Sequence, residues 1–218
     1  MLKPLLDRLP SPQRKLWTEL AEVPRGFVLY GGTALTLRMG HRISEDFDFF
    51  SNEALLPDAL ERKVPFLQKA VRLQSSPNTL VSSVDRDGAV KVSFFGGLNL
   101  RRAEDPEPVE GPGILVASLL DLAATKVKVV QDRAEAKDYQ DVHRLLDEVD
   151  LSQALAAARA VYGPTFNPLL SLKALSYFKD GDLSTLPEAV RSRLSAAVRA
   201  VSLDRLPDIH PLPGGLLP

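Results

Sequence analysis

The sequence predicts an α/β (α+β) protein, with a small mixed β-sheet and flanking helices in its first half and a helical bundle in its second half. Between residues 26 and 95, short apolar runs rich in β-branched and aromatic residues predict strands. Asp87 and Gly88 separate the last two of these runs and are a strong signal for a β-hairpin. From Ser118 onward, helical segments bounded by Gly and Pro account for most of the chain.

The composition is that of a globular chain and excludes several kinds of chemistry. With 218 residues, the chain has room for one large domain or two small domains that share a core. The net charge of −1 gives no general attraction to nucleic acid, so contact with RNA would need a local basic patch. Because cysteine is absent, disulfides, thiolate metal sites and cysteine nucleophiles are excluded.

Neither a leader nor a membrane segment is evident. The N-terminal residues lack the apolar core of a signal peptide. No apolar run is long enough to span a bilayer. We therefore expect a cytoplasmic protein with no membrane partner.

The elements that frame the predicted sheet can be taken in order. A first helix is expected at Ser11 and Pro12, because a hydroxyl residue followed by proline is typical of a helix N-terminus. Residues 52–70 predict one or two helices, interrupted by prolines. Three β-like runs follow, at residues 71–74, 79–84 and 89–95.

A strand, two glycines and a short helix adjoin one another early in the chain. Residues 26–30 predict a short buried strand that ends at Gly31 and Gly32. A helix over residues 33–39 should follow and end at Gly40, a candidate left-handed C-cap. The two glycines leave backbone N–H groups open at the start of this helix, which makes a suitable site for a phosphate.

Two aspartates close this region. In an extended strand, side chains two residues apart share a face, so Asp46 and Asp48 should point together while Phe47 and Phe49 point to the other side. Paired carboxylates repel each other unless a cation lies between them, and such hard oxygen ligands suit Mg²⁺. Two roles stay open for Thr33, which can cap the helix or contact a phosphate. A phosphate site followed by a metal-binding pair indicates metal-assisted phosphoryl or nucleotidyl transfer.

The helical half carries a second set of charged residues. Lys126, Val130 and Arg133 fall on one face of a helix that a capping box opens near residue 118. A second helix, beginning near residues 134–136, would place Asp138 and Asp141 on a shared face. Lys126 suits a nucleotide's phosphates, and Arg133 can grip a phosphate or pair with an aspartate. Asp138 can orient Lys126 or Arg133, or act as the base that takes a proton from the acceptor.

Other interpretations of this half stay open. The same residues fit a plain amphipathic helix pair with ion pairs such as Lys137 with Asp141. A capping box at Thr185 and Glu188 predicts a last helix to about residue 202. Three arginines give this helix a basic edge, which suits either RNA or solvent: Arg191, Arg193 and Arg199.

Two stretches resemble a known family. A Gly-Gly-Thr turn, a short helix and Asp-x-Asp resemble the first motif of the nucleotidyltransferase superfamily, and GGTALTLRMGHRISEDFDFF is similar to the AbiEii/AbiGii toxin family. The stretch LAATKVKVVQDRAEAKDYQDVHRLL resembles the second motif of that family. The matching positions in the second motif are Lys126, Arg133, Lys137, Asp138 and Asp141. The resemblance extends over roughly residues 25–150.

The resemblance implies a nucleotidyltransferase-like core at residues 1–112 and a helical domain at residues 113–218 that closes the cleft. It implies Mg²⁺-dependent transfer of a nucleoside monophosphate from an NTP to an acceptor, with tRNA as that acceptor and a cognate antitoxin as partner. In this scheme Asp46 and Asp48 hold the metal and Asp138 is base or orienter. The residues expected to hold the triphosphate are Gly31, Gly32, Thr33, Lys126 and Arg133.

One departure from the superfamily pattern keeps alternatives open. Many nucleotidyltransferases carry a third carboxylate on the strand that here contains Ser93. The site can therefore hold one metal or take a further ligand from elsewhere. A transferase that modifies a small molecule, such as an aminoglycoside or a metabolite, is one alternative. A nucleotide-binding module without catalysis is another.

Overall fold

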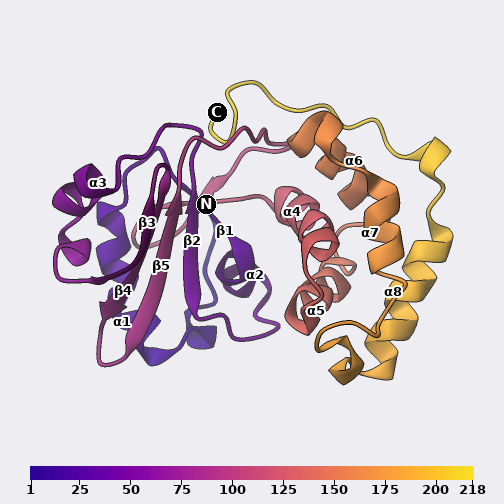
Figure 1. Ribbon diagram of the computed structural model, residues 1–218, viewed down its shortest axis with the longest axis horizontal. Helices are drawn as coiled ribbons and strands as arrows, with labels where there is room; N and C mark the ends of the chain where they lie inside the picture. Colours follow the sequence, from indigo (N-terminus) through magenta and orange to yellow (C-terminus); the bar gives the residue numbers. More distant parts are fainter. The chain divides into compact units, whose positions relative to one another are not determined.

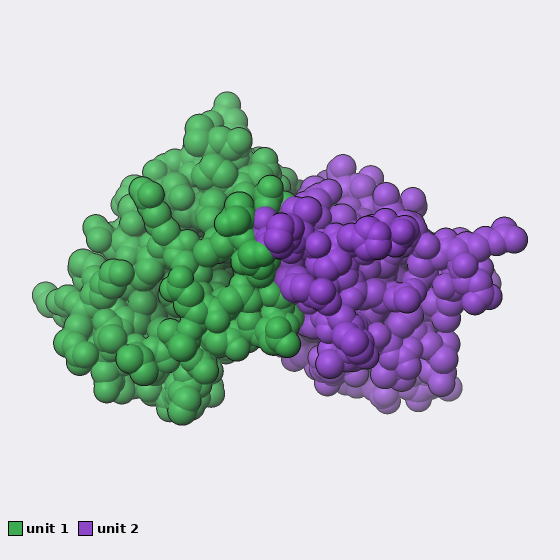
Figure 2. Space-filling view, turned by 90° about the horizontal axis from the view of Figure 1, so that it is seen from above, with its two compact units in different colours: residues 1–100, 105–118, 214–218 green, residues 101–104, 119–213 purple.

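The computed structural model describes residues 1–218, and the chain forms two compact units, coloured separately in Figure 2. Unit 1 contains Met1–Leu100, Asp105–Ser118 and Gly214–Pro218, and unit 2 contains Arg101–Glu104 and Leu119–Pro213. The domain boundary expected at residue 112 stays a prediction, and the compact units divide the chain near residues 100, 104, 118 and 213.

Backbone pairing and hydrogen bonds on both sides of residue 112 explain the division into two units. Residues 115 and 116 pair with a strand of the sheet and so belong to unit 1. Both carboxylate oxygens of Asp121 accept backbone N–H groups, from Ala103 at 2.8 Å and Glu104 at 3.1 Å, and this holds residues 101–104 in unit 2.

The sheet of unit 1 is mixed, as predicted, and has the strand order β3-β4-β5-β2-β1-β7-β6. β1 is antiparallel to β2 and parallel to β7, and β2 is parallel to β5. Figure 1 shows β2, β4 and β5 as neighbouring arrows. The strands are β1 (Val28–Tyr30), β2 (Asp46–Phe50), β3 (Val71–Ser76), β4 (Thr79–Asp85), β5 (Ala89–Phe95), β6 (Glu107–Pro108) and β7 (Leu115–Val116). The predicted hairpin joins β4 to β5, with positive φ at Asp87 and Gly88.

Alternate residues of β2 differ in burial, as the two-residue period requires. Phe47 and Phe49 are fully buried, whereas Asp46 and Asp48 are partly exposed. The ring of Phe94 in β5 stacks on Phe49 at a centroid distance of 5.2 Å and makes the apolar side of the sheet continuous. One side of the sheet centre is therefore apolar core, and the other carries the carboxylates.

Helix α2 (Gly31–Met39) begins two residues earlier than predicted and ends at Gly40, whose φ of 60° confirms the left-handed cap. The Arg38 side chain donates from Nε to the Ala117 carbonyl at 3.0 Å and from Nη1 to Glu107 at 2.8 Å. These bonds fix α2 to the end of the sheet that contains β6 and β7. The remaining helices of unit 1 are α1 (Ser11–Leu16) and α3 (Pro57–Lys63), with 3₁₀ turns at Leu6–Arg8, Trp17–Glu22 and Pro65–Leu67.

Unit 2 is helical, with α4 at its centre. The helices are α4 (Leu119–Asp132), α5 (Ala136–Leu145), α6 (Leu151–Tyr162), α7 (Pro168–Ala174) and α8 (Glu188–Ala200), with 3₁₀ turns at Gly163–Thr165, Leu183–Thr185 and Leu203–Arg205. α4 packs against α5, α6 and α7, and α8 packs against α5 (Figure 1). No helix in the chain combines the length and apolar character needed to cross a membrane.

The start of α8 corrects one prediction. Thr185 lies in the preceding 3₁₀ turn, where its hydroxyl donates to the Asp182 carbonyl at 2.6 Å, and Pro187 directly precedes the helix. The expected capping box therefore does not form there. A capping box is present instead at α6, between Asp150 and Gln153.

Candidate active site

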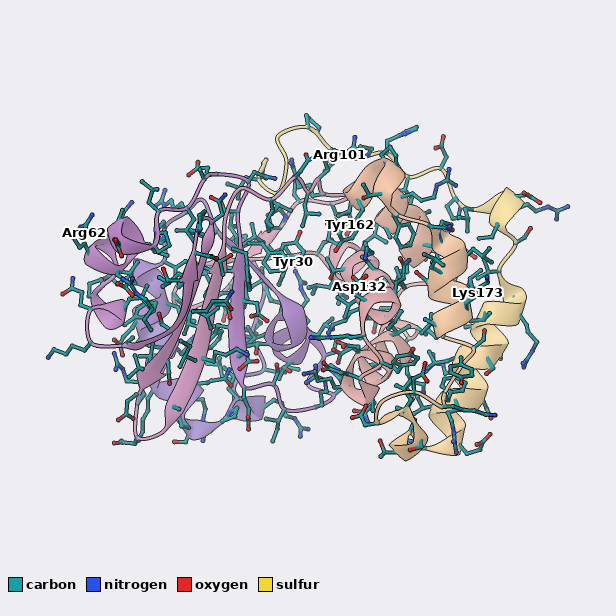
Figure 3. All side chains as sticks on the ribbon, viewed as in Figure 1. Tyr30, Arg62, Arg101, Asp132, Tyr162 and Lys173 are labelled. Atoms are coloured by element: carbon teal, nitrogen blue, oxygen red, sulfur yellow. The ribbon has the colours of Figure 1, made fainter.

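The aspartate pair lies where three strands of unit 1 adjoin. In the sheet register, Asp46 is opposite Lys91 and Asp48 is opposite Ser93, both across the parallel pair of β2 and β5. Asp48 is also opposite Tyr30, the last residue of β1, which Figure 3 labels. Because directly opposed residues share a sheet face, these five side chains belong to one surface.

Lys91 is a residue of this surface whose position sequence reasoning missed. Its ammonium donates to Asp46 Oδ2 at 2.7 Å, and both side chains are partly exposed. Lys91 reaches Asp46 because β2 and β5 pair in parallel register, which brings together residues 45 positions apart in the chain. Lys91 therefore supplies a positive charge directly beside one of the two carboxylates.

The two glycines at the start of α2 are required by close approach. Gly31 has a φ of +76°, and a Cβ there would lie 2.7 Å from Asp48 Oδ2. A Cβ at Gly32 would lie 2.6 Å from Arg42 Nη2 and 2.7 Å from Ser44 Oγ. The N-terminus of α2, which no side chain caps, thus lies against a carboxylate and a guanidinium. Backbone N–H groups at such a helix start suit a phosphate, as the sequence predicted.

Thr33 takes neither of the roles expected for it. Its side chain is fully buried, and its hydroxyl donates to the backbone carbonyl of Asp46. The hydroxyl of Thr36, one turn later, lies 3.0 Å from the Arg42 carbonyl. Both threonines therefore hold the segment from Arg42 to Asp46 against α2, and Thr33 is a positioning residue rather than a phosphate ligand.

The donor set around Asp46 and Asp48 fits one Mg²⁺. Magnesium is usually bound through one or two carboxylates, with water and substrate phosphates completing its octahedron. Ser93, which is buried beside Asp48, stands where a third carboxylate would be expected. No His, Asp or Glu joins the pair to make a group of three that could hold a metal. The residues thus suit a single metal better than two.

Unit 2 holds a separate, buried ionic cluster. Lys126 on α4 contacts two carboxylates of α5, with Nζ 2.7 Å from Asp138 Oδ1 and 2.6 Å from Asp141 Oδ2. Both aspartates are fully buried and, as predicted, share one face of α5. Lys137 pairs with Glu135 at 2.8 Å, so the alternative pairing of Lys137 with Asp141 does not form.

Arg133 is the exposed member of this cluster. It follows the last residue of α4, and its Nε donates to Asp138 Oδ2 at 2.7 Å. Burial by itself raises the pKa of Asp138, but the hydrogen bond from Arg133 and the charge of Lys126 lower it, and the pKa lies below the ordinary 3.8. Asp138 is therefore ionised at neutral pH.

These contacts revise the expectation for Lys126. Its ammonium is buried and is shared by two carboxylates, so it is not presented to a phosphate. Arg133 keeps about half of its side chain exposed and is the more accessible of the two cations. The other predicted residues divide cleanly, with Gly31, Gly32, Asp46 and Asp48 in unit 1 and Asp138 in unit 2.

Comparison with known proteins identifies the family to which the aspartate pair of unit 1 and the ionic cluster of unit 2 belong. The family model described as "Nucleotidyl transferase AbiEii toxin, Type IV TA system" matches residues 16–208, which include both clusters. The chain belongs to the AbiEii family. It is thus a nucleotidyltransferase toxin of the type IV toxin–antitoxin class, and the family resemblance of its two motifs is confirmed.

One relative by sequence and two solved structures are similar to this AbiEii chain. An uncharacterized protein of Aquifex aeolicus (strain VF5) is 32% identical over 181 residues, which cover 80% of this chain and 85% of that protein. The toxin MenT4 of Mycobacterium tuberculosis H37Rv, a nucleotidyltransferase, superposes with a TM-score of 0.61 at 16% identity, over 86% of this chain and 83% of that one. JHP933 from Helicobacter pylori gives a TM-score of 0.56 at 17% identity, over 86% and 89% of the two chains. The solved structures show a shared fold.

Proposed function

We propose that this AbiEii-family toxin transfers a nucleoside monophosphate from an NTP to tRNA and releases pyrophosphate, with Mg²⁺ held by Asp46 and Asp48. One observation carries the proposal: the two carboxylates share a partly exposed sheet face, and Asp48 lies against an uncapped helix start. A bound Mg²⁺ would neutralise phosphate charge and hold the triphosphate in place. The cytoplasm, where NTPs and tRNA both occur, is the proposed location, and a cognate antitoxin is the proposed protein partner.

The site residues of unit 1 each have a defined role in this proposal. Gly31 and Gly32 present backbone N–H groups to the phosphates, because neither has a side chain that blocks their approach. Lys91 holds Asp46 while the site is empty and contacts a phosphate when the nucleotide is bound. Thr33 keeps the start of β2 in place through the Asp46 carbonyl.

The geometry of unit 2 favours one of the two roles predicted for Asp138. A general base works best when its pKa lies near the working pH. The pKa of Asp138 lies below its ordinary value, and two cations occupy its oxygens. We therefore propose that Asp138 orients Arg133 toward phosphate, and that Lys126 and Asp141 keep Asp138 in position.

The proposal is tested by a transfer assay with Mg²⁺, each labelled NTP in turn and total tRNA. Wild type is compared with Asp46→Asn and Asp48→Asn, and with Glu45→Gln, which changes an exposed acid directly before β2. Loss of a bound metal removes several kcal/mol of transition-state stabilisation, so we expect the two Asp variants to lose about 100-fold or more of the label. Glu45→Gln should keep it.

Other outcomes identify the alternatives. NTP turnover with pyrophosphate release but no label on tRNA would remove tRNA as acceptor and favour a small-molecule acceptor. NTP binding without release of pyrophosphate from the NTP, whichever acceptor is added, would indicate a binding module. Equal labelling by wild type and Asp46→Asn would remove the carboxylate pair from the mechanism.

A further inference from the structure

A groove of about 550 Å³ lies on unit 2, between α8 and the segment that follows α7. Five residues of α8 line it, and each lies three or four residues from another of the set, so they form one stripe along the helix: Glu188, Arg191, Ser192, Ser195 and Arg199. Residues 176–179 form the opposite wall. Every lining residue belongs to unit 2, so the groove is complete within that unit.

The charge of the groove is positive and mostly unneutralised. Three of its residues are cationic, Lys179, Arg191 and Arg199, and only Glu188 is acidic. Glu188 pairs with Arg191 at 3.0 Å, which leaves Lys179 and Arg199 without an acidic partner. The Nε of Arg191 is out of contact with solvent and has no hydrogen-bond acceptor. The groove therefore offers positive charge, at Lys179 and Arg199 above all, that an anionic ligand would neutralise.

An exposed aromatic ring completes the surface. Tyr177 is 49% exposed and lines the groove, so its ring is accessible to a ligand there. Its neighbour Phe178 packs edge-on against Tyr139 of α5 at a centroid distance of 6.2 Å, and the Tyr139 hydroxyl donates to the Ala174 carbonyl at 3.2 Å. The wall that carries Tyr177 is thus anchored to α5, the helix of Asp138.

Tyr177 also connects the groove to the ionic cluster. It lines a second pocket of about 290 Å³, whose other lining residues include Arg133 and Tyr139. One ring is therefore shared by the basic groove and by the pocket of the proposed phosphate ligand.

We infer that this groove binds a single-stranded segment of the RNA acceptor, with phosphates at Lys179, Arg191 and Arg199 and a base stacked on Tyr177. A basic groove with an aromatic platform is the combination that binds single-stranded nucleic acid, since charge tracks the backbone and stacking accepts any base. The inference rests on the proposed function, because it assigns the surface that holds the proposed tRNA. An acidic polypeptide would match the charge but would not account for the exposed ring at the junction of the two pockets.

The test measures binding of total tRNA to the full chain by fluorescence anisotropy at several salt concentrations. Lys179→Glu and Arg199→Glu should each weaken binding about 10-fold at low salt. The slope of log K against log salt should become less steep by about 1 in each variant, because one phosphate contact is lost. Tyr177→Ala should weaken binding about 10-fold, whereas Tyr177→Phe, which keeps the ring, should bind like wild type. Arg205→Glu makes the same charge change at an exposed arginine outside the groove and should leave affinity unchanged.

The outcomes separate this inference from the proposed function. If wild type binds and labels tRNA while the groove variants bind it equally well, the groove is not the RNA surface, and the proposed function stands. If wild type neither binds nor labels tRNA, both the inference and the tRNA acceptor are overturned. Affinity for NTP with Mg²⁺ and the thermal midpoint should match wild type in Lys179→Glu and Arg199→Glu, which shows that the fold and the nucleotide site are intact.

Discussion

Two lysine–aspartate pairs in this AbiEii toxin have the same length and opposite surroundings. Lys91 and Asp46 in unit 1 lie 2.7 Å apart, with 43% and 41% of their side chains exposed. Lys126 and Asp138 in unit 2 also lie 2.7 Å apart, with 6% and 0% exposed. Distance alone therefore cannot distinguish a site that meets ligands from one that holds the fold.

Burial decides what each pair can do. An exposed pair gains little in water, so a metal or a phosphate can displace one partner at small cost. A buried pair has already lost its hydration, and removal of one partner leaves an uncompensated charge in a medium of low polarity. The pair of unit 1 is thus suited to exchange partners, and the pair of unit 2 is suited to keep them.

The largest effect is expected from Lys126→Met. Methionine fills similar volume but cannot carry the charge that both Asp138 and Asp141 contact. We expect the free energy of unfolding to fall by about 3–5 kcal/mol, measured by urea denaturation at neutral pH. Lys128→Met, which breaks an exposed pair with Asp132 on the same helix, should cost less than about 1 kcal/mol. Equal losses in the two variants would contradict the role of burial.

A pH-dependent effect is expected from Asp138→Asn. The pKa of Asp138 in the folded protein is lowered. The ionised carboxylate therefore contributes fully to the free energy of unfolding above the unfolded pKa of about 3.9, and this contribution is lost as the pH falls through the folded pKa. At neutral pH the variant should be about 1–3 kcal/mol less stable than wild type. Below about pH 4 this difference should shrink, because only wild type takes up a proton there.

Urea denaturation at a series of pH values checks this prediction. A difference that is constant down to about pH 2 would show that Asp138 acts through hydrogen-bond geometry alone, since its charge would then contribute nothing. A difference that grows toward low pH would have the wrong sign and would exclude a lowered pKa.

A smaller effect with a second readout is expected from Gly31→Ala. Positive φ costs an L-residue about 1–2 kcal/mol, and the new Cβ would also contact Asp48 Oδ2. Gly113→Ala is the matched control, because Gly113 has a φ of +69° and nothing within 4 Å of a Cβ. Both variants should lose similar stability, measured by thermal unfolding. Only Gly31→Ala should also weaken binding of NTP with Mg²⁺, measured by calorimetry. If Gly31→Ala binds NTP as tightly as wild type, the glycine turn is not part of the nucleotide site.

The smallest change in stability is expected from Lys91→Met. Loss of an exposed pair should alter the free energy of unfolding by less than about 1 kcal/mol. Calorimetry without nucleotide should show tighter Mg²⁺ binding, because the ammonium no longer competes for Asp46. Affinity for NTP should fall as a phosphate contact is lost. Weaker Mg²⁺ binding in this variant would contradict the proposed exchange.

Local pattern predicted much of the candidate site. The period of two along β2 places Asp46 and Asp48 together, and the spacing of three places Asp138 and Asp141 on one face of α5. Gly40 ends α2 as its lack of a Cβ allows. Each of these features depends on residues within one or two turns of each other, so the sequence by itself determined them.

Long-range packing decided the rest. Lys91 meets Asp46 only because β5 pairs with β2 in parallel register. Thr185 has the spacing of a capping box with Glu188, yet it lies in a 3₁₀ turn, and α8 begins directly after Pro187. Lys126 resembles a phosphate ligand in sequence, but the packing of α4 on α5 encloses its ammonium between two carboxylates. Only the tertiary structure decided these surroundings, because the environment of a charge depends on partners that are distant in the chain.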